Sequence, residues 1–361
     1  MSLAQLQINN LRNIEAARLN LHPKLNFFIG ENGSGKTSLL EAVYLLGSGH
    51  SFRTREISPL ISNGKDSLTI FARKGDEQTV SIQKSLTTPA QVRVNSFPCQ
   101  TSSELARFLP CQVFYQDIFQ IIDAGPAVRR TVLDWGLFHV KQNYHALWKN
   151  YKRALKQRNS LLKQRASQQQ LRPWNKVLVE LATQMHEARK EYFACLLPEF
   201  HLILQQLSTV DCSLAYYKGW DKKGAAKPLE LILEDSYQSD ISRQFTQYGA
   251  HQADLIFTIN NLNAKQYLSR GQQKIILFAL KLAQARLNKT SCLYLCDDLT
   301  SELDEAHTKR LLNLIGTMDG QFFITSVDES LLRNNQGQST FFSMHHGEVV
   351  ELPGSQSLAQ A

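Results

Sequence analysis

A run of eight residues near the N-terminus has the residue types and spacing needed to bind a nucleoside triphosphate. It matches the pattern G-x-x-x-x-G-K-[ST], directly after an apolar segment and before a helix-forming one. Glycines let successive backbone N–H groups point at phosphate oxygens, Lys36 neutralises the β- and γ-phosphates, and the Thr37 hydroxyl ligates Mg²⁺. Kinases, GTPases and transporters share this loop, so it predicts nucleotide binding without deciding the class of protein. Its residues are Gly30, Glu31, Asn32, Gly33, Ser34, Gly35, Lys36 and Thr37.

Two adjacent carboxylates supply a second part of a nucleotide site. Asp297 and Asp298 follow the apolar run 292–296, which predicts a buried strand. We expect Asp297 to hold the magnesium ion and Asp298 to orient the attacking water as a base. A turn or helix-capping role is the alternative for Asp298.

A third motif narrows the class. Ser269, Arg270, Gly271 and Gln272 begin an apolar helix 28 residues before Asp297, counted from 269 to 297. The motif resembles the LSGGQ signature of ABC ATPases, with an arginine in place of the first glycine. Its serine hydroxyl, free N–H groups and helix dipole suit a γ-phosphate. In that superfamily the signature contacts the ATP of the other subunit, so the resemblance implies an ATP-bridged homodimer.

Further positions follow from the same resemblance. Asp304 closes a stretch that resembles the D-loop, which lies across such a dimer. Gln116 is the candidate for the Q-loop glutamine that senses Mg²⁺ and the γ-phosphate, and a plain loop glutamine is the alternative. Thr325 and Ser326 occupy the neighbourhood where ABC ATPases commonly place a switch histidine. Because that histidine is missing and Asp298 is one methylene shorter than the usual glutamate, we expect slow hydrolysis.

Apolar alternation predicts the strands that must position these groups. Strands are expected at 4–8, 16–21 and 25–29, and a helix from Lys36 to about residue 46. Alternation over 67–94 predicts an antiparallel meander. In the C-terminal third we expect helix 272–287, strand 292–296, helix 305–315, strand 322–326 and a closing hairpin over 341–344 and 348–352.

Two long helices are expected in the middle of the chain. They cover about 141–163 and 174–207, with Pro173 starting the second. In the second helix, apolar residues recur at steps of three and four, which predicts a helical hairpin packed within the chain. A dimerising coiled coil is the alternative. The stripe consists of Leu178, Leu181, Met185, Ala188, Tyr192 and Cys195.

These elements predict an α/β fold, an ABC-type P-loop ATPase head with an antiparallel β meander plus a helical second domain. Residues 1–130 are expected to form the N-terminal part of the head with the meander, and 131–245 the basic helical domain. Residues 246–353 would complete the head with the signature, the second nucleotide motif and the D-loop. The tail 354–361 is expected to be disordered.

Charge is distributed unevenly along the chain. There are 40 Lys and Arg against 32 Asp and Glu, a net charge of +8, which favours a polyanionic partner. Between Trp135 and Val179 ten residues are basic and none is acidic. The six cysteines lack CxxC spacing and predict reduced core thiols. With no secretory signal and no apolar stretch of membrane-spanning length, we expect a cytoplasmic protein.

Several longer sequence segments between residues 10 and 304 carry a family resemblance, and they follow one another in the family's order. They are residues 10–13, 49–53, 129–135, 155–159, 171–174, 249–255, the signature at 269–272, and 297–298 followed by 301–304. Together they resemble the RecF family of bacterial recombination and gap-repair proteins. His251 and Asp254 lie in the segment 249–255, and the sequence offers no physical account of their role.

The family resemblance implies a function. It implies a weak, DNA-stimulated ATPase in which Arg12 is among the nucleotide contacts and hydrolysis releases DNA. An ATP-bound homodimer would close on double-stranded DNA near single-strand gaps. RecR and RecO would be partners in loading the RecA recombinase and in inducing the SOS response.

Some of the basic residues are candidates for DNA contacts. We expect them to bind backbone phosphates and not to recognise the base sequence. A solvated surface is the alternative for each of them. Two other classes stay open: a transporter-type ATPase whose basic hairpin docks on a membrane partner or acidic lipid, and the ATPase half of a nuclease or defence system. The candidate DNA contacts are Arg53, Arg55, Arg129, Arg130, Lys149, Lys152, Arg153 and Lys156.

Overall fold

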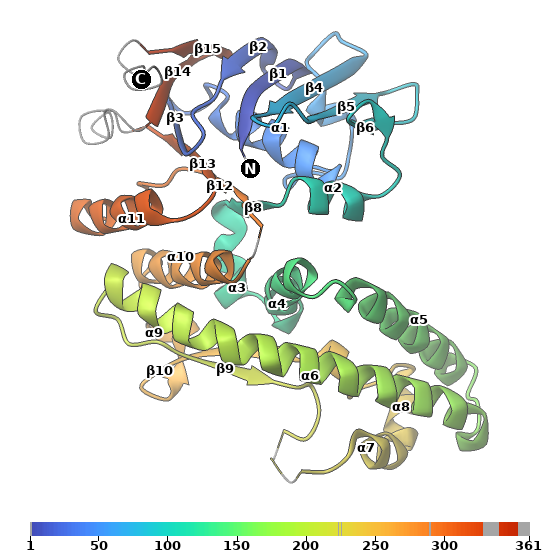
Figure 1. Cartoon of the computed structure of the whole chain (residues 1–361). Helices are drawn as coiled ribbons and strands as arrows, with labels where there is room; N and C mark the ends of the chain where they lie inside the picture. Colours follow the sequence, from blue (N-terminus) through green and yellow to red (C-terminus); the bar gives the residue numbers. More distant parts are fainter. Residues whose placement is uncertain (1, 223, 225, 289, 328–338, 353–361) are drawn as a thin grey trace. The chain divides into compact units, whose positions relative to one another are not determined.

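The structure is a computed structural model and describes residues 2–352 apart from 223, 225, 289 and 328–338 (Figure 1). The tail predicted from residue 354 lies outside the described residues. The chain forms two compact units. Unit 1 comprises Met1–Asp117 and Thr290–Ala361, and unit 2 comprises Ile118–Lys289. Among the described residues, every helix falls short of the length and hydrophobicity that a bilayer span requires.

Among its described residues, unit 1 contains two sheets and three α-helices. The strands are β1 (Leu3–Leu11), β2 (Ile14–Asn20), β3 (Leu25–Ile29), β4 (Ser67–Lys74), β5 (Thr79–Ser85), β6 (Gln91–Val94), β7 (Phe97–Pro98), β8 (Cys111–Phe114), β12 (Leu293–Cys296), β13 (Gln321–Ser326), β14 (Ser339–His345) and β15 (Glu348–Glu351). The helices are α1 (Lys36–Ser48), α2 (Ser102–Phe108) and α11 (Glu305–Thr317), with a 3-10 turn at Ser58–Leu60.

One sheet is mainly parallel, in the order β15-β14-β3-β13-β12-β8. Every residue of β3, β12 and β13 is buried, as expected for strands covered on both faces. In the register, Ile29 pairs with Ser326 and Cys296 pairs with Ile324. Because these parallel strands end at the same edge, the phosphate loop after β3 and the carboxylates after β12 meet there.

The other sheet is the predicted antiparallel meander, in the order β2-β1-β4-β5-β6-β7. Burial alternates along β4, so one face of the strand is covered. Ile70 pairs with Ile8 on one side and with Ile82 on the other. All three side chains are buried in the core that also holds the apolar side of α1.

Unit 2 is mainly helical. Its helices are α3 (Gln120–Asp123), α4 (Pro126–Val140), α5 (Tyr144–Lys163), α6 (Gln168–Leu207), α7 (Leu229–Asp235), α8 (Tyr237–Arg243), α9 (Ala264–Tyr267) and α10 (Arg270–Leu287), with a 3-10 turn at Ala250–Gln252. Its strands, β9 (Ser213–Tyr217), β10 (Asp254–Ile259) and β11 (Leu262–Asn263), form a sheet in the order β11-β10-β9. A further 3-10 helix, Gln116–Phe119, spans the boundary between the units.

The predicted helical hairpin is formed by α5 and α6, which run side by side (Figure 1). The 40-residue α6 also packs along α10. Of the predicted stripe, Leu178 and Tyr192 are buried, but Cys195 is exposed and Leu196 is buried instead. A helix with 3.6 residues per turn drifts against a 3.5-residue repeat, so the buried stripe shifts by one position.

The prediction that Pro173 starts the second helix is wrong. Helix α6 begins at Gln168, where Ser167 forms a capping box with Gln170. The Ser167 hydroxyl accepts a bond from the Gln170 backbone N–H, and the Gln170 side chain accepts one from the Ser167 N–H. These two bonds satisfy backbone N–H groups at the N-terminus of the helix. The helix can therefore begin at residue 168, and Pro173 lies inside its first turns.

The compact units divide the chain differently from the predicted domains. Unit 1 ends at Asp117 and resumes at Thr290, whereas the sequence placed boundaries at 130 and 246. Because α10 packs along α6, the signature helix is grouped with unit 2. The signature and the phosphate loop therefore belong to different compact units.

Two buried arginines of unit 2 pair with aspartates. Arg158 of α5 pairs with Asp240 of α8 at 2.8 Å, and both side chains are fully buried. Arg189 of α6 donates to Asp134 of α4 at 2.8 Å and to the Ala250 carbonyl at 2.6 Å. These pairs join helices that are distant in sequence, so charge is part of the core of this unit.

Candidate nucleotide-binding site and basic surface

The phosphate loop connects β3 to α1 and takes a shape that requires glycine. Gly33 and Gly35 have φ values of 84° and 111°, in the left-handed region. A Cβ added at Gly35 would lie 3.0 Å from the Asn13 side-chain amide. Asn13 also donates to the Gly33 carbonyl at 3.2 Å and accepts from the Ser38 hydroxyl at 3.2 Å. Asn13 lies in the turn between β1 and β2 and stabilises the phosphate loop through these contacts. The sequence analysis gave Asn13 no individual role.

Lys36 and Ser34 lie where phosphate oxygens would enter the loop. The Lys36 ammonium donates to the Gly30 and Glu31 carbonyls at 2.6 and 2.8 Å. Burial lowers the pKa of Lys36, because a low-dielectric setting disfavours the charged form. The Ser34 hydroxyl is buried and meets no hydrogen-bond partner within the described part of the chain. A phosphate group would satisfy both side chains.

Asp297 follows β12 and faces the beginning of α1. Its carboxylate accepts hydrogen bonds from the Thr37 hydroxyl at 3.0 and 3.1 Å and from the Thr325 hydroxyl at 2.8 Å. Burial raises the pKa of Asp297. The separation between Thr37 Oγ1 and the carboxylate is that of neighbouring oxygens around an octahedral magnesium ion, roughly 3 Å. These two residues therefore fit a magnesium site.

Thr325 positions the second aspartate, Asp298, by a hydrogen bond to its backbone N–H. Its hydroxyl accepts from the Asp298 N–H at 2.8 Å while donating to Asp297. Asp298 has a φ of 48°, a left-handed conformation that aspartate adopts more readily than most residues. Next to Thr325, the Ser326 hydroxyl lies 2.9 Å from that of Thr300. The two residues at the expected histidine position thus position the aspartate segment.

Arg12 and Arg53 converge on a buried carboxylate of α1. The Arg12 guanidinium donates to both oxygens of Glu41, one bond being 2.9 Å long, and Arg53 lies 3.9 Å from the same carboxylate. Glu41 is fully buried and also accepts from the Ser51 hydroxyl. Sequence reasoning missed Glu41, although a single acid within the apolar run 39–43 was a signal for it.

The signature begins α10 as the sequence predicts. Ser269 is the N-cap and forms a capping box with Gln272, and Gly271 follows in the first turn. The Arg270 guanidinium donates to Asp123 at 2.6 Å and lies 5.0 Å from the Phe119 ring centroid. Ser269 and Arg270 are exposed, so their polar groups are open to another molecule.

Two other predicted nucleotide residues lie in separate places. Asp304 is the N-cap of α11, where it accepts from the His307 N–H at 2.7 Å. This bond and the neighbouring His307 imidazole lower the pKa of Asp304. Gln116 begins the 3-10 helix at the end of unit 1, and its side chain lies outside the described part of the structure.

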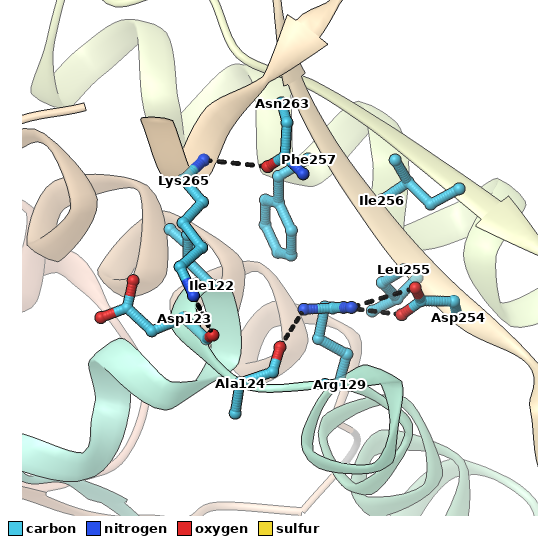
Figure 2. Close-up of a pocket in the computed structure, with 11 residues that line it drawn as sticks. Ile122, Asp123, Ala124, Arg129, Asp254, Leu255, Ile256, Phe257, Asn263 and Lys265 are labelled. Atoms are coloured by element: carbon cyan, nitrogen blue, oxygen red, sulfur yellow. Dashed lines mark hydrogen bonds and ion pairs between the residues drawn. The ribbon is translucent and has the colours of Figure 1, made fainter. Parts of the chain in front are cut away.

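Arg129 and Asp254 form an ion pair at the edge of a cavity of about 320 Å³ in unit 2 (Figure 2). Arg129 donates to the two Asp254 oxygens at 2.6 and 3.0 Å and to the Ala124 carbonyl at 2.7 Å. Lys265 crosses the cavity and donates to the Asp123 carbonyl at 2.6 Å. Asp254 thereby gains a role that the sequence did not reveal: it ties β10 to α4.

Arg129 and Arg130 are therefore poor candidates for DNA contacts. Arg129 is only 14% exposed, and Arg130 donates to the Ala253 carbonyl at 2.8 Å. Both guanidinium groups hold α4 against the segment leading into β10. The bonds they make inside unit 2 would have to break before they could bind a phosphate, so we leave these two predicted contacts out of the proposal below.

His251 has a structural role. Its imidazole lies 2.7 Å from the Tyr151 hydroxyl and 2.8 Å from the Thr246 carbonyl. Burial lowers the pKa of His251 to about 4, so the ring is neutral near pH 7. The ring therefore links α5 to the segment after α8 without adding charge.

The remaining predicted cations gather on one side of α5. At about 100° per residue, Lys149, Lys152, Arg153 and Lys156, together with Lys163, lie within an arc of about 100°. All five are exposed. The buried residues of the helix, among them Tyr151 and Arg158, lie on the opposite side. We call these five cations the basic face. Arg55, in unit 1, is also exposed.

The parallel sheet, the glycine-rich loop and the paired aspartates define a P-loop ATPase head of the ABC/SMC class. The family model described as the RecF/RecN/SMC N terminal domain matches residues 2–349. The chain belongs to the RecF family of DNA replication and repair proteins. It is 39% identical over 342 residues to the DNA replication and repair protein RecF of Cellvibrio japonicus, covering 92% of this chain and 93% of the relative. It is 35% identical to RecF of Stutzerimonas stutzeri, covering 98% of each.

Solved structures agree with this assignment. A structure described as the recombination mediator protein RecF with ATP in the RecFOR pathway matches with a TM-score of 0.81 and 25% identity, covering 97% of each chain. An Smc head bound to the C-winged helix domain of ScpA matches with a TM-score of 0.64 at 16% identity, covering 100% of this chain and 99% of that one. The predicted family and fold class are confirmed.

Proposed function

We propose that the protein is an ATP-gated DNA-binding protein of recombinational gap repair. ATP with Mg²⁺ induces a homodimer that clamps double-stranded DNA near single-strand gaps, and weak, DNA-stimulated hydrolysis releases it. The dimer acts with RecR and RecO to load the RecA recombinase and to support SOS induction. Support for this comes from the family membership and from the matching RecF structure, which is described with ATP in the RecFOR pathway.

The nucleotide part rests on the groups at the edge of the parallel sheet. Lys36 exchanges the Gly30 and Glu31 carbonyls for phosphate oxygens, and the loop N–H groups bind the rest of the phosphate chain. Thr37 and Asp297 would hold Mg²⁺, which would neutralise charge on the phosphates. Asp298 accepts a hydrogen bond from the attacking water and orients it.

The dimer part rests on exposed residues of the signature and the D-loop. Ser269 presents its hydroxyl at the N-terminus of an 18-residue helix, and the capping box keeps that end ordered. The Asp304 side chain is 64% exposed. A second copy brings its bound nucleotide to the exposed Ser269, so each nucleotide contacts both chains. The Arg270–Asp123 ion pair holds the signature arginine in place for that encounter.

The basic face carries the DNA part of the proposal. A surface cavity of about 580 Å³ beside it is lined by six residues, three of which are lysines. Because the buried side of α5 packs on unit 2, the cations are held on a rigid helix and can line up with a phosphate backbone. Lysine and arginine on a regular helix bind phosphates without reading sequence.

The salt dependence of duplex binding tests the basic face. If about six phosphates are neutralised, log K falls against log salt with a slope on the order of −5 in ATP. Replacing Lys149 and Arg153 with glutamine is expected to weaken binding and to make the slope shallower by about 2 units. Fluorescence anisotropy of a labelled duplex over a salt series measures both quantities.

A matched variant removes the same charge elsewhere in unit 2. Lys190→Gln with Arg243→Gln changes two exposed cations outside the basic face. This variant is expected to keep the parent slope. Equal slopes for all three proteins, or a flat salt dependence of the parent, would remove the basic face from the account.

A further inference from the structure

A further cavity of unit 2 lies between α4, α5, α6 and the 3-10 turn Ala250–Gln252 and has a volume of about 570 Å³. This size falls within the range of small-ligand sites, roughly 300–1,000 Å³. The cavity takes no part in the nucleotide site. The residues that line it include Trp135, Phe138, Tyr144, His145, Trp148 and Lys152.

Planar rings form much of the wall. Trp135 and Phe138 each lie against His139, with centroid distances of 4.5 and 5.0 Å. His145 lies 5.4 Å from Phe138 and 6.4 Å from Trp148. The rings follow one another from α4 to α5. Both tryptophans are half-buried, so part of each ring surface is accessible.

Several polar residues that line the cavity already form hydrogen bonds with other residues of unit 2. Asp134 accepts from the Tyr144 hydroxyl at 2.5 Å and from Arg189 at 2.8 Å, so its charge is compensated. Tyr151 bonds to His251, which is neutral near pH 7 because burial lowers its pKa. A ligand therefore meets a preformed site, and binding needs no rearrangement of these groups.

The charge of Lys152 favours an anionic neighbour. Lys152 lines the cavity, and its ammonium lies 3.8 Å from the Trp148 ring centroid. Lys152 is also a member of the basic face, so the cavity opens beside the proposed phosphate contacts. Non-aromatic apolar residues in the lining are only Ala127, Met185 and Ala250, so an aliphatic protein segment finds little matching surface.

We propose that this cavity binds an unpaired nucleobase of a DNA strand whose phosphates run along the basic face. The base stacks on the ring wall beside Trp148, and Lys152 pairs with an adjacent phosphate. Stacking on aromatic side chains tolerates any base, because every base has a flat π surface. The inference rests on the proposed DNA binding and adds to it the recognition of a single-stranded segment next to a duplex.

The test compares two labelled DNAs by fluorescence anisotropy in ATP: a blunt duplex, and the same duplex with a single-stranded oligothymidine tail. We expect the parent to bind the tailed duplex about tenfold more tightly. Trp148→Ala is expected to abolish this advantage while binding the blunt duplex like the parent, and Trp148→Phe to retain most of it. Circular dichroism and the melting temperature show whether each variant is folded.

A tail of abasic sugars separates stacking from charge, because it keeps the phosphates and lacks the bases. The parent is expected to gain nothing from the abasic tail. An equal advantage of the thymidine tail in the parent and in Trp148→Ala, or an equal gain from the abasic tail, would overturn the base-binding site. Failure of the parent to bind the blunt duplex would instead contradict the proposed function.

Discussion

Replacing Asp298 with asparagine is expected to lower the ATP turnover rate by about 100- to 1,000-fold while leaving ATP binding intact. Asparagine tolerates the left-handed φ of 48° at this position and keeps the N–H that bonds to Thr325. The substitution therefore removes the base and preserves the backbone. Asp297, Thr37 and Lys36 are untouched, so the phosphates and the metal are still held.

Two measurements check this result. Steady-state phosphate release reports turnover, and binding of a fluorescent ATP analogue reports affinity. If hydrolysis releases DNA, the Asp298→Asn protein is also expected to dissociate from duplex DNA more slowly in ATP than the parent does. Asp76→Asn, an exposed change in the turn between β4 and β5, is the control and should leave turnover unaltered. Turnover within a few-fold of the parent would exclude Asp298 as the base.

The second large effect concerns stability. Replacing Asp240 with alanine is expected to destabilise unit 2 by about 3–5 kcal/mol, because it leaves the charge of Arg158 buried without its partner. Asp240 also accepts from the Gln247 backbone N–H at 3.2 Å, so a second bond is lost. Urea unfolding followed by far-UV circular dichroism measures the change, and the midpoint should fall.

An exposed ion pair provides the comparison. Lys227 and Asp235 are 41% and 66% exposed, and exposed pairs contribute little to stability. Asp235→Ala is therefore expected to leave the unfolding midpoint unchanged. If Asp240→Ala and Asp235→Ala had the same midpoint, the buried pair would not be part of the stabilising core.

Local sequence signals predicted where the motif residues lie in the fold. The glycine-rich loop, the carboxylates after β12 and the serine that caps α10 depend on neighbours within a few residues, so their types and order indicate their positions. Most strands of unit 1 were also predictable, because burial on one or both faces leaves a period in the sequence, but β7 and β8 lie outside the predicted strands. The same holds for α1, which begins at Lys36 as predicted.

Contacts between distant residues could not be predicted. Arg158 was counted among the ten basic residues between Trp135 and Val179, but it is buried and pairs with Asp240, which lies 82 residues later. Arg129 was assigned to DNA, whereas its partner Asp254 lies 125 residues away. In both cases the charge is visible in the sequence and its partner is not. For Pro173 the deciding signal was local. Proline favours the first turn of a helix, but the capping box three to six residues earlier starts the helix before Pro173.

The most direct test of the central claim measures binding of a labelled gapped duplex by fluorescence anisotropy, with ATP and with ADP. The parent is compared with Lys36→Arg, whose side chain keeps its charge but not its fit to the loop. If ATP gates the clamp, the parent binds more tightly in ATP than in ADP and the variant shows no such difference. Equal binding in the two nucleotides by the parent, or an unchanged ATP effect in the variant, would contradict an ATP-gated DNA clamp.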